Sequence, residues 1–168
     1  NQYNQTRTDI LEPDMKNVKN IKISEDIGNI EVITTDGGSV KLEAVINVKS
    51  NKEDITKKAI QDIEANYEIK GGNLEFKIYM AGTKNAASEY FSKKYVNKGL
   101  NHDNTYYHVE YKLYIPSSSN YNYELQADVG DIKVNGVSGN IEAEADVGDI
   151  EIKGVKSGRI TLESDVGA

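Results

Sequence analysis

The stretch from residue 128 to residue 132 reads Asp-Val-Gly-Asp-Ile, and it returns 18 residues later as Asp146-Val147-Gly148-Asp149-Ile150. A third copy begins with Asp165-Val166-Gly167, after 19 residues instead of 18. Within this period, glycine-led units open at 130, 139, 148 and 158. Each unit of nine or ten residues is long enough for one short strand and one turn, so the spacing predicts two strands per repeat.

Alternation of apolar and polar residues assigns the faces of these strands. The residues expected to point inward are Ile132, Val134, Ile141, Ala143, Ile150, Ile152, Ile160 and Leu162. A second set is expected to fill the corners: Val137, Val147, Val155 and Val166. Two strands per 18 residues predict a right-handed β-solenoid whose equivalent residues lie about 4.8 Å apart in successive coils. An antiparallel meander with similar turns is the alternative.

The N-terminal part predicts longer strands that the repeats continue. The run 26–32 echoes the repeat motif, and 67–80 reads as a hairpin around Gly71-Gly72-Asn73. Between them, Ile55, Ala59, Ile60 and Ile63 share one helical face, and Ser50 and Glu53 have the spacing of a capping box, which predicts a helix at 52–65. Residues 81–105 are expected to form a polar loop.

These patterns predict an all-β fold with one helix, organised as a single domain at 1–168. We expect an N-terminal β-region at 14–116, containing the helix at 52–65, and the repeat coils of the solenoid at 120–168.

Composition narrows the function. The net charge is -7, and residues 120–168 carry 10 Asp and Glu against 4 Lys and Arg, which disfavours nucleic-acid binding. The absence of Cys excludes disulfides and thiolate-ligated metals. No apolar run approaches the roughly 20 residues of a membrane-spanning helix. No cofactor is expected.

The repeats resemble those of a bacterial family of putative adhesins, a domain of unknown function with tandem G-D-I-x-V-x-G-V-S-G-N-I sequences. The resemblance is sharpest from Gly130 to Val166. It implies a β-solenoid and an extracellular or cell-envelope location, and it implies no reaction, cofactor or catalytic residue. The Tyr-rich stretch at 90–107 and the stop at Ala168, in mid-repeat, depart from the family pattern.

The repeated acids are the first candidate site: Asp128, Asp131, Asp146, Asp149 and Asp165. Stacked coils would bring like charges together, and each Asp is expected to accept hydrogen bonds from the backbone of its own turn. Two other interpretations stay open. Calcium between coils would resemble nonapeptide rolls, and a carbohydrate-active β-helix enzyme would use Asp128, Asp131, Asp146 and Asp149.

Aromatic residues form the second candidate site. Eight of the 11 Tyr lie from Tyr90 to Tyr123, and the expected interaction surface comprises Tyr90, Phe91, Tyr95, Tyr106 and Tyr114. The alternative is that these rings seal the sheet. His102, Asp103 and His108 suggest at most a weak metal site.

The sequence therefore predicts a non-catalytic envelope module, an adhesin or structural spacer that meets a protein or glycan at the cell surface. Because the last coil offers no polar cap, we expect either further chain after Ala168 or end-to-end self-association.

Overall fold

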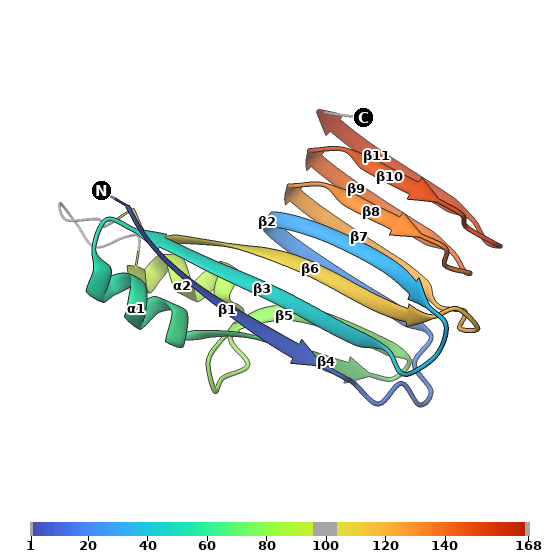
Figure 1. The fold of residues 1–168 in the computed structure, drawn as a ribbon, viewed down its shortest axis with the longest axis horizontal. Helices are drawn as coiled ribbons and strands as arrows, with labels where there is room; N and C mark the ends of the chain where they lie inside the picture. The colour runs from blue at the N-terminus through green and yellow to red at the C-terminus, as the bar shows by residue number, and fades with distance from the viewer. Residues whose placement is uncertain (1, 96–103, 167–168) are drawn as a thin grey trace.

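The computed structural model describes residues 2–95 and 104–166 (Figure 1). Within them lie two helices, α1 (Glu53–Gln61) and α2 (Ala87–Tyr95), and 11 strands. The N-terminal strands are β1 (Tyr3–Leu11), β2 (Asn20–Thr35), β3 (Lys41–Ser50), β4 (Ile63–Lys70) and β5 (Asn73–Met80). The others are β6 (Tyr106–Pro116), β7 (Asn122–Val129), β8 (Ile132–Asn135), β9 (Ile141–Val147), β10 (Ile150–Lys153) and β11 (Ile160–Val166).

The long strand β2 organises the sheet, because its two halves pair with different neighbours. Residues 20–27 lie parallel to β7, and 20–23 also lie parallel to β5. Residues 28–35 lie parallel to β6, and 30–33 to β8. Two rows of strands therefore meet at β2. The first row is β1, β3, β6, β2, β8 and β10, and the second row is β4, β5, β2, β7, β9 and β11.

The predicted right-handed β-solenoid is wrong. The strands belong to a single mixed sheet of 11 strands, in which β1, β3 and β6 are successively antiparallel and β4 and β5 form an antiparallel hairpin. The parallel alignment of the glycine-led segments does hold, because β9 pairs in register with β7 and with β11, and β10 with β8. The predicted hairpin around Gly71 is also present.

The two rows enclose one apolar core. Ile23 and Leu125 reach it from the second row, and Val32 and Leu113 from the first. Among the repeat residues predicted to point inward, four are buried: Ile132, Val134, Ile141 and Ala143. Ile150 and Ile152 are half-buried, whereas Ile160 and Leu162 are exposed because no described strand lies beyond β11.

The helical regions differ from expectation. The helix predicted at 52–65 spans Glu53–Gln61, with Lys52 as its N-cap and no side-chain capping bond. Ile63 lies at the position a continuing helical face would use, but it opens β4, where Ile63 and Ala65 alternate into the core. The loop expected at 81–105 contains α2, which buries Phe91 and Tyr95 against the sheet.

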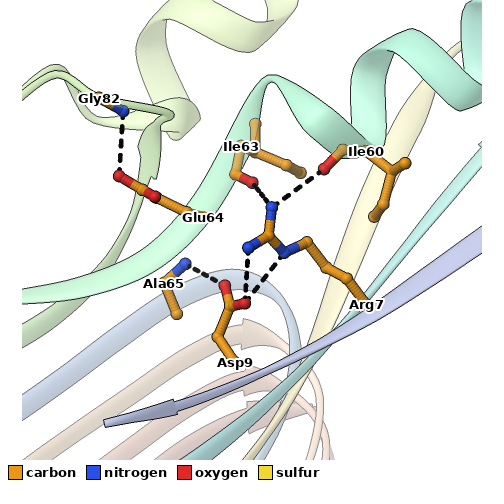
Figure 2. Close-up of polar contacts among 7 residues, drawn as sticks. All are labelled: Arg7, Asp9, Ile60, Ile63, Glu64, Ala65 and Gly82. Atoms are coloured by element: carbon orange, nitrogen blue, oxygen red, sulfur yellow. Dashed lines mark hydrogen bonds and ion pairs between the residues drawn. The ribbon is translucent and has the colours of Figure 1, made fainter.

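At the β1 and β4 end of the sheet, the core is closed by α1 and by a polar contact from β1 (Figure 2). Arg7 Nη1 donates to the carbonyl oxygens of Ile63 (2.9 Å) and Ile60 (3.5 Å), the second of which lies in the last turn of α1. Arg7 also bonds Asp9 (2.7 Å), and Asp9 Oδ2 accepts from the Ala65 amide at 2.8 Å. Backbone groups that α1 and the edge of β4 leave unpaired are thereby satisfied.

Glycine is required where the chain turns between the two rows. A Cβ built on Gly130 would lie 1.8 Å from the carbonyl oxygen of Gly28, and one built on Gly148 would lie 2.0 Å from that of Gly130. Real Cβ atoms do not approach backbone this closely, so adjacent strands can stack here only without side chains.

We predict that Gly130→Ala lowers the free energy of unfolding by about 2–4 kcal/mol, because the new methyl group must push two strands apart. Gly37→Ala is the matched control, since its Cβ would have no neighbour within 4 Å. Urea titration should show the control within about 1 kcal/mol of wild type. Equal losses in the two variants would contradict the close-approach argument.

Candidate interaction surface

Two neighbouring columns of side chains cross the second row where β7, β9 and β11 end. The register places Glu25, Ala127 and Ala145 level with one another, and likewise Ile27, Val129 and Val147. The residues between them therefore form one column, the aspartate ladder: Asp26, Asp128, Asp146 and Asp165. The adjoining column is the aliphatic ladder: Ile27, Val129, Val147 and Val166.

The aliphatic ladder is open to solvent. The exposed fractions are 45% for Ile27, 47% for Val129, 48% for Val147 and 62% for Val166. Val147 and Val166 were expected to fill corners of the core, and this expectation is wrong because each lies where its strand ends before the turn. Of the predicted corner residues, only Val137 is buried, and Val155 is half-buried. Four neighbouring strands thus expose one aliphatic side chain each.

The aspartate ladder concentrates negative charge beside this stripe. Partial burial and the neighbouring carboxylate of Asp26 raise the pKa of Asp128. One step inward on the same face, desolvation and the charges of Glu163, Asp146 and Asp165 raise the pKa of Glu144. Like charges one strand spacing apart oppose each other, so the column favours a cationic neighbour.

The outer surface of the first row carries charges of alternating sign. Across five adjacent strands, the side chains that lie level with one another alternate in sign: Glu43, Lys112, Glu31, Lys133 and Glu151. Lys112 Nζ lies 3.5 Å from Glu31 Oε1. This face compensates its own charges, whereas no lysine or arginine among residues 2–95 and 104–166 forms an ion pair with the aspartate ladder.

The other two repeat acids have a structural role at the turn. Asn29 Oδ1 accepts from the Asp131 amide (2.7 Å), and Asp131 Oδ1 accepts from the Asp149 amide (2.9 Å). Asn140 Oδ1 accepts in the same way from the Arg159 amide (2.8 Å). Each bond joins successive repeats, so the Asp131 side chain accepts from the next repeat and not, as expected, from the backbone of its own turn. Short oxygen-bearing side chains suit this position because they reach the amide stacked above them.

The predicted aromatic surface is divided between the core and the exterior. Phe91 and Tyr95 are buried, with ring centroids 4.9 Å apart, and the Tyr95 hydroxyl donates to Asp62. Tyr114 is half-buried under Lys41, whose Nζ lies 4.8 Å from the ring centroid. Only Tyr90 and Tyr106 are exposed, at 38% and 40%.

Tyr106 is exposed on β6, where its hydroxyl accepts from Gln2 Nε2 at 3.1 Å. A hollow of about 120 Å³ between α2 and β2 is lined by Ile27, Ser88 and Tyr106, among others. Gln2 precedes β1, which lies on the side of β6 away from β2, so the Tyr106 ring is directed away from the ladders. The candidate interaction surface therefore consists of the two ladders, and Tyr90 and Tyr106 lie apart from it.

A buried acid lies directly behind this surface. Glu25 points into the core and is 6% exposed, at the level where the following strands carry Ala127 and Ala145. Tyr111 Oη donates to Glu25 Oε2 at 3.1 Å. Burial raises the pKa of Glu25 to about 7, although the Tyr111 hydrogen bond acts in the opposite direction. The same environment raises the pKa of Tyr111.

Among residues 2–95 and 104–166, no group of three or more His, Cys, Asp or Glu is placed to hold a metal ion. His108 is half-buried on β6, and His102 and Asp103 lie outside the described residues. Neither described helix is long and apolar enough to cross a membrane.

Sequence reasoning missed the aliphatic ladder and Glu25. The signal for the ladder was present, because Val follows Asp in every copy of the Asp-Val-Gly motif, but alternation alone does not distinguish a corner side chain that points inward from one that points outward. Glu25 precedes the echo of the motif and sits at an apolar position of β2, which only the register reveals.

No protein-family model matches the chain, and no curated protein matches it either. Solved structures that align with it include a "putative cell adhesion protein" from Clostridium sporogenes, at 14% identity and a TM-score of 0.40, covering 95% of this chain and 100% of that one. A "putative adhesin" from Bacteroides fragilis aligns at 12% identity and a TM-score of 0.31, covering 97% and 95% of the two chains.

A "putative adhesin" from Parabacteroides distasonis aligns at 11% identity and a TM-score of 0.34, covering 94% of this chain and 70% of that one. All three TM-scores are below 0.5. The family resemblance of the repeats stays a prediction.

The buried carboxyl predicts a pH-dependent stability. Because the folded-state pKa of Glu25 is about 7 against 4.5 for the free side chain, the folded protein holds its proton more tightly than the unfolded chain does. The resulting stabilisation is fully present below pH 4.5 and is lost as the pH rises through 7. This difference amounts to about 3 kcal/mol.

Glu25→Gln should remove that loss, since the amide stays neutral and its oxygen can still accept from Tyr111. Urea unfolding between pH 5 and pH 8 would show the variant gaining on wild type as the pH rises. Glu124→Gln is the matched control, because Glu124 is exposed on neighbouring β7. Parallel pH profiles for Glu25→Gln and wild type would rule out a buried, titrating Glu25.

Proposed function

We propose that this chain is a non-catalytic interaction module that binds a protein partner through the two ladders. The partner would place apolar side chains on the aliphatic ladder and lysine or arginine side chains on the aspartate ladder. One observation carries the proposal: four successive strands expose an aliphatic residue next to a column of aspartates that has no ion pair within the described part of the chain.

The chemistry of the surface favours a protein partner over a glycan. Contiguous exposed apolar groups rimmed by charge are typical of protein contacts. Flat ring faces that would stack on sugars are not part of the two ladders, whose described residues are aliphatic or acidic. The strands hold both columns at fixed spacing, so little conformational entropy is lost on binding.

We place the module outside the cell or in the cell envelope, as an adhesin or a structural spacer. The support for this location is the resemblance of the Gly130 to Val166 repeats to those of the putative-adhesin family. The single observation above supports binding, and it is independent of the location.

A defined peptide tests the binding surface. The probe is a fluorescently labelled peptide that forms an amphipathic helix, with leucine on one face and lysine on the other. Fluorescence anisotropy measures its binding. The paired variant Val129→Thr, Val147→Thr keeps side-chain shape but removes apolar contact, and it should weaken binding by about tenfold or more. Asp128→Asn with Asp146→Asn should weaken it at low salt, with an effect that fades as salt is added.

Matched controls separate this surface from the overall charge of the protein. Glu31→Gln with Glu151→Gln also removes two negative charges, but from the outer surface of the first row, and should leave peptide binding unchanged. A peptide with glutamate in place of lysine should not bind. If both pairs of acid variants weaken binding equally, or the threonine variants bind as wild type does, the ladder surface is not the binding site.

A further inference from the structure

The outer surface of the second row is hollowed where its strands begin. The hollow has a volume of about 570 Å³, which lies in the range of ligand-binding pockets. It crosses the first residues of β5, β2, β7 and β9, which run parallel to one another (Figure 1). Along β7, Asn122 in this hollow precedes Asp128 of the aspartate ladder by about 20 Å of extended strand.

Two columns of polar side chains line the hollow, which we call the asparagine groove. The first column contributes one amide from each strand: Asn73, Asn20, Asn122 and Asn140. The second column lies two residues further along the same strands: Glu75, Lys22, Glu124 and Glu142. Neighbours within a column are about 4.8 Å apart, and the two columns are about 6.6 Å apart.

The amides are already ordered without a ligand. Asn122 Nδ2 donates to Asn20 Oδ1 (3.0 Å), and Asn20 Nδ2 donates to Asn73 Oδ1 (2.8 Å). Asn140 Oδ1 accepts from the Arg159 amide at 2.8 Å. A carboxamide has two N–H groups, and each of these bonds uses one of them at most, so every strand can still donate into the groove. Little side-chain entropy would be lost when a ligand binds.

The second column consists mainly of acceptors. Lys22 Nζ lies 3.7 Å from Glu75 Oε2 and 3.9 Å from Glu124 Oε2, so one ammonium group is shared between two carboxylates. Glu142 adds a third carboxylate, which is exposed. Carboxylates accept strong hydrogen bonds from hydroxyl groups, and their excess over lysine repels an anionic ligand.

We propose that the asparagine groove binds a neutral, extended oligosaccharide that lies across the strands. Sugar hydroxyls both donate and accept, so a pyranose ring between the columns can accept from an amide at one edge and donate to a carboxylate at the other. On β2, Lys22 would donate instead. Each pyranose advances an extended glycan by roughly one strand spacing, about 4.8 Å, so successive rings meet equivalent groups on successive strands. Four strands would hold about four units.

A peptide fits the groove less well than a glycan does. Side chains on one face of an extended peptide repeat every 6.6 to 6.8 Å, about two ångströms more than the spacing of the columns. An amphipathic helix would need exposed apolar contacts, which the ladders offer and these two columns do not. The one aromatic residue among the described lining residues, Tyr123, is buried, so hydrogen bonds carry recognition. We therefore expect a dissociation constant of about 1 mM.

Nuclear magnetic resonance on the 168-residue protein tests the site. The probes are β-1,4-linked oligomers of glucose, mannose and N-acetylglucosamine, from one to six units long. The side-chain amide signals of Asn20, Asn73 and Asn122 should shift on titration. Affinity should rise with chain length up to about four units and then level off, because longer chains extend beyond the four strands.

Substitution of the amides should weaken binding without disturbing the fold. Asn20→Thr with Asn122→Thr removes two amide donors and should raise the dissociation constant about tenfold. Both positions are exposed and threonine suits strands, so circular dichroism should be unchanged. Asn4→Thr, at an exposed position of β1, is the matched control and should bind as wild type does.

The carboxylates should select against acidic sugars. Oligogalacturonate, with one carboxylate per unit, should bind more weakly than the neutral oligomers at low salt, and the difference should shrink as salt is added. Glu124→Gln with Glu142→Gln should reduce this discrimination. Glu31→Gln with Glu151→Gln, which removes two charges from the first row, should leave it intact.

The glycan site goes beyond the proposed protein contact, and each can fail alone. Val129→Thr with Val147→Thr should weaken the leucine–lysine peptide and leave oligosaccharide binding unchanged. The proposal is overturned if no neutral oligomer shifts the asparagine signals at about ten times the expected dissociation constant. Equal binding by the Asn20–Asn122 and Asn4 variants, or affinity independent of chain length, would also contradict it. Shifts caused by the peptide alone would assign the groove to a protein partner.

Discussion

The bend of β2 is the constraint on which the rest of the structure depends. One strand of 16 residues pairs with β5 and β7 before Gly28, and with β6 and β8 from Gly28 onward. The change of partners requires the chain to pass very close to its neighbour, since a Cβ on Gly28 would lie 2.0 Å from the Val109 carbonyl oxygen. Later strands copy this corner at Gly130 and Gly148, so the position of β2 sets the position of each strand stacked on it.

The same corner creates the candidate surface. At each corner the side chain before glycine is exposed, and it is Ile27, Val129, Val147 or Val166. The residue before it is always an aspartate. A fold that repeats its turn therefore repeats its exposed side chains, which form one stripe across four neighbouring strands.

The sequence was sufficient for local features and insufficient for the closure of the sheet. The repeat spacing predicts the parallel pairing of β7, β9 and β11, because identical motifs favour identical register. It carries no information on β1, β3 and β6, whose antiparallel pairing makes the sheet mixed. Helix α2 was missed because its turns are polar outside Phe91 and Tyr95, and the exposed ladder was missed because a corner breaks simple alternation. Asp131 and Asp149 were recognised, but their bonds join different repeats, which only three-dimensional stacking reveals.

The alternating charges of the first row limit how the chain can change in length. Excision of the 18 residues from 130 to 147 would leave the apolar layers matched, because Ile150 and Ile152 would take the places of Ile132 and Val134 beside β2. It would also set Glu151 beside Glu31, where Lys133 now separates them. The apolar core would stay matched if one 18-residue repeat were gained or lost. The charges on the first row would keep alternating in sign only if repeats were gained or lost in pairs.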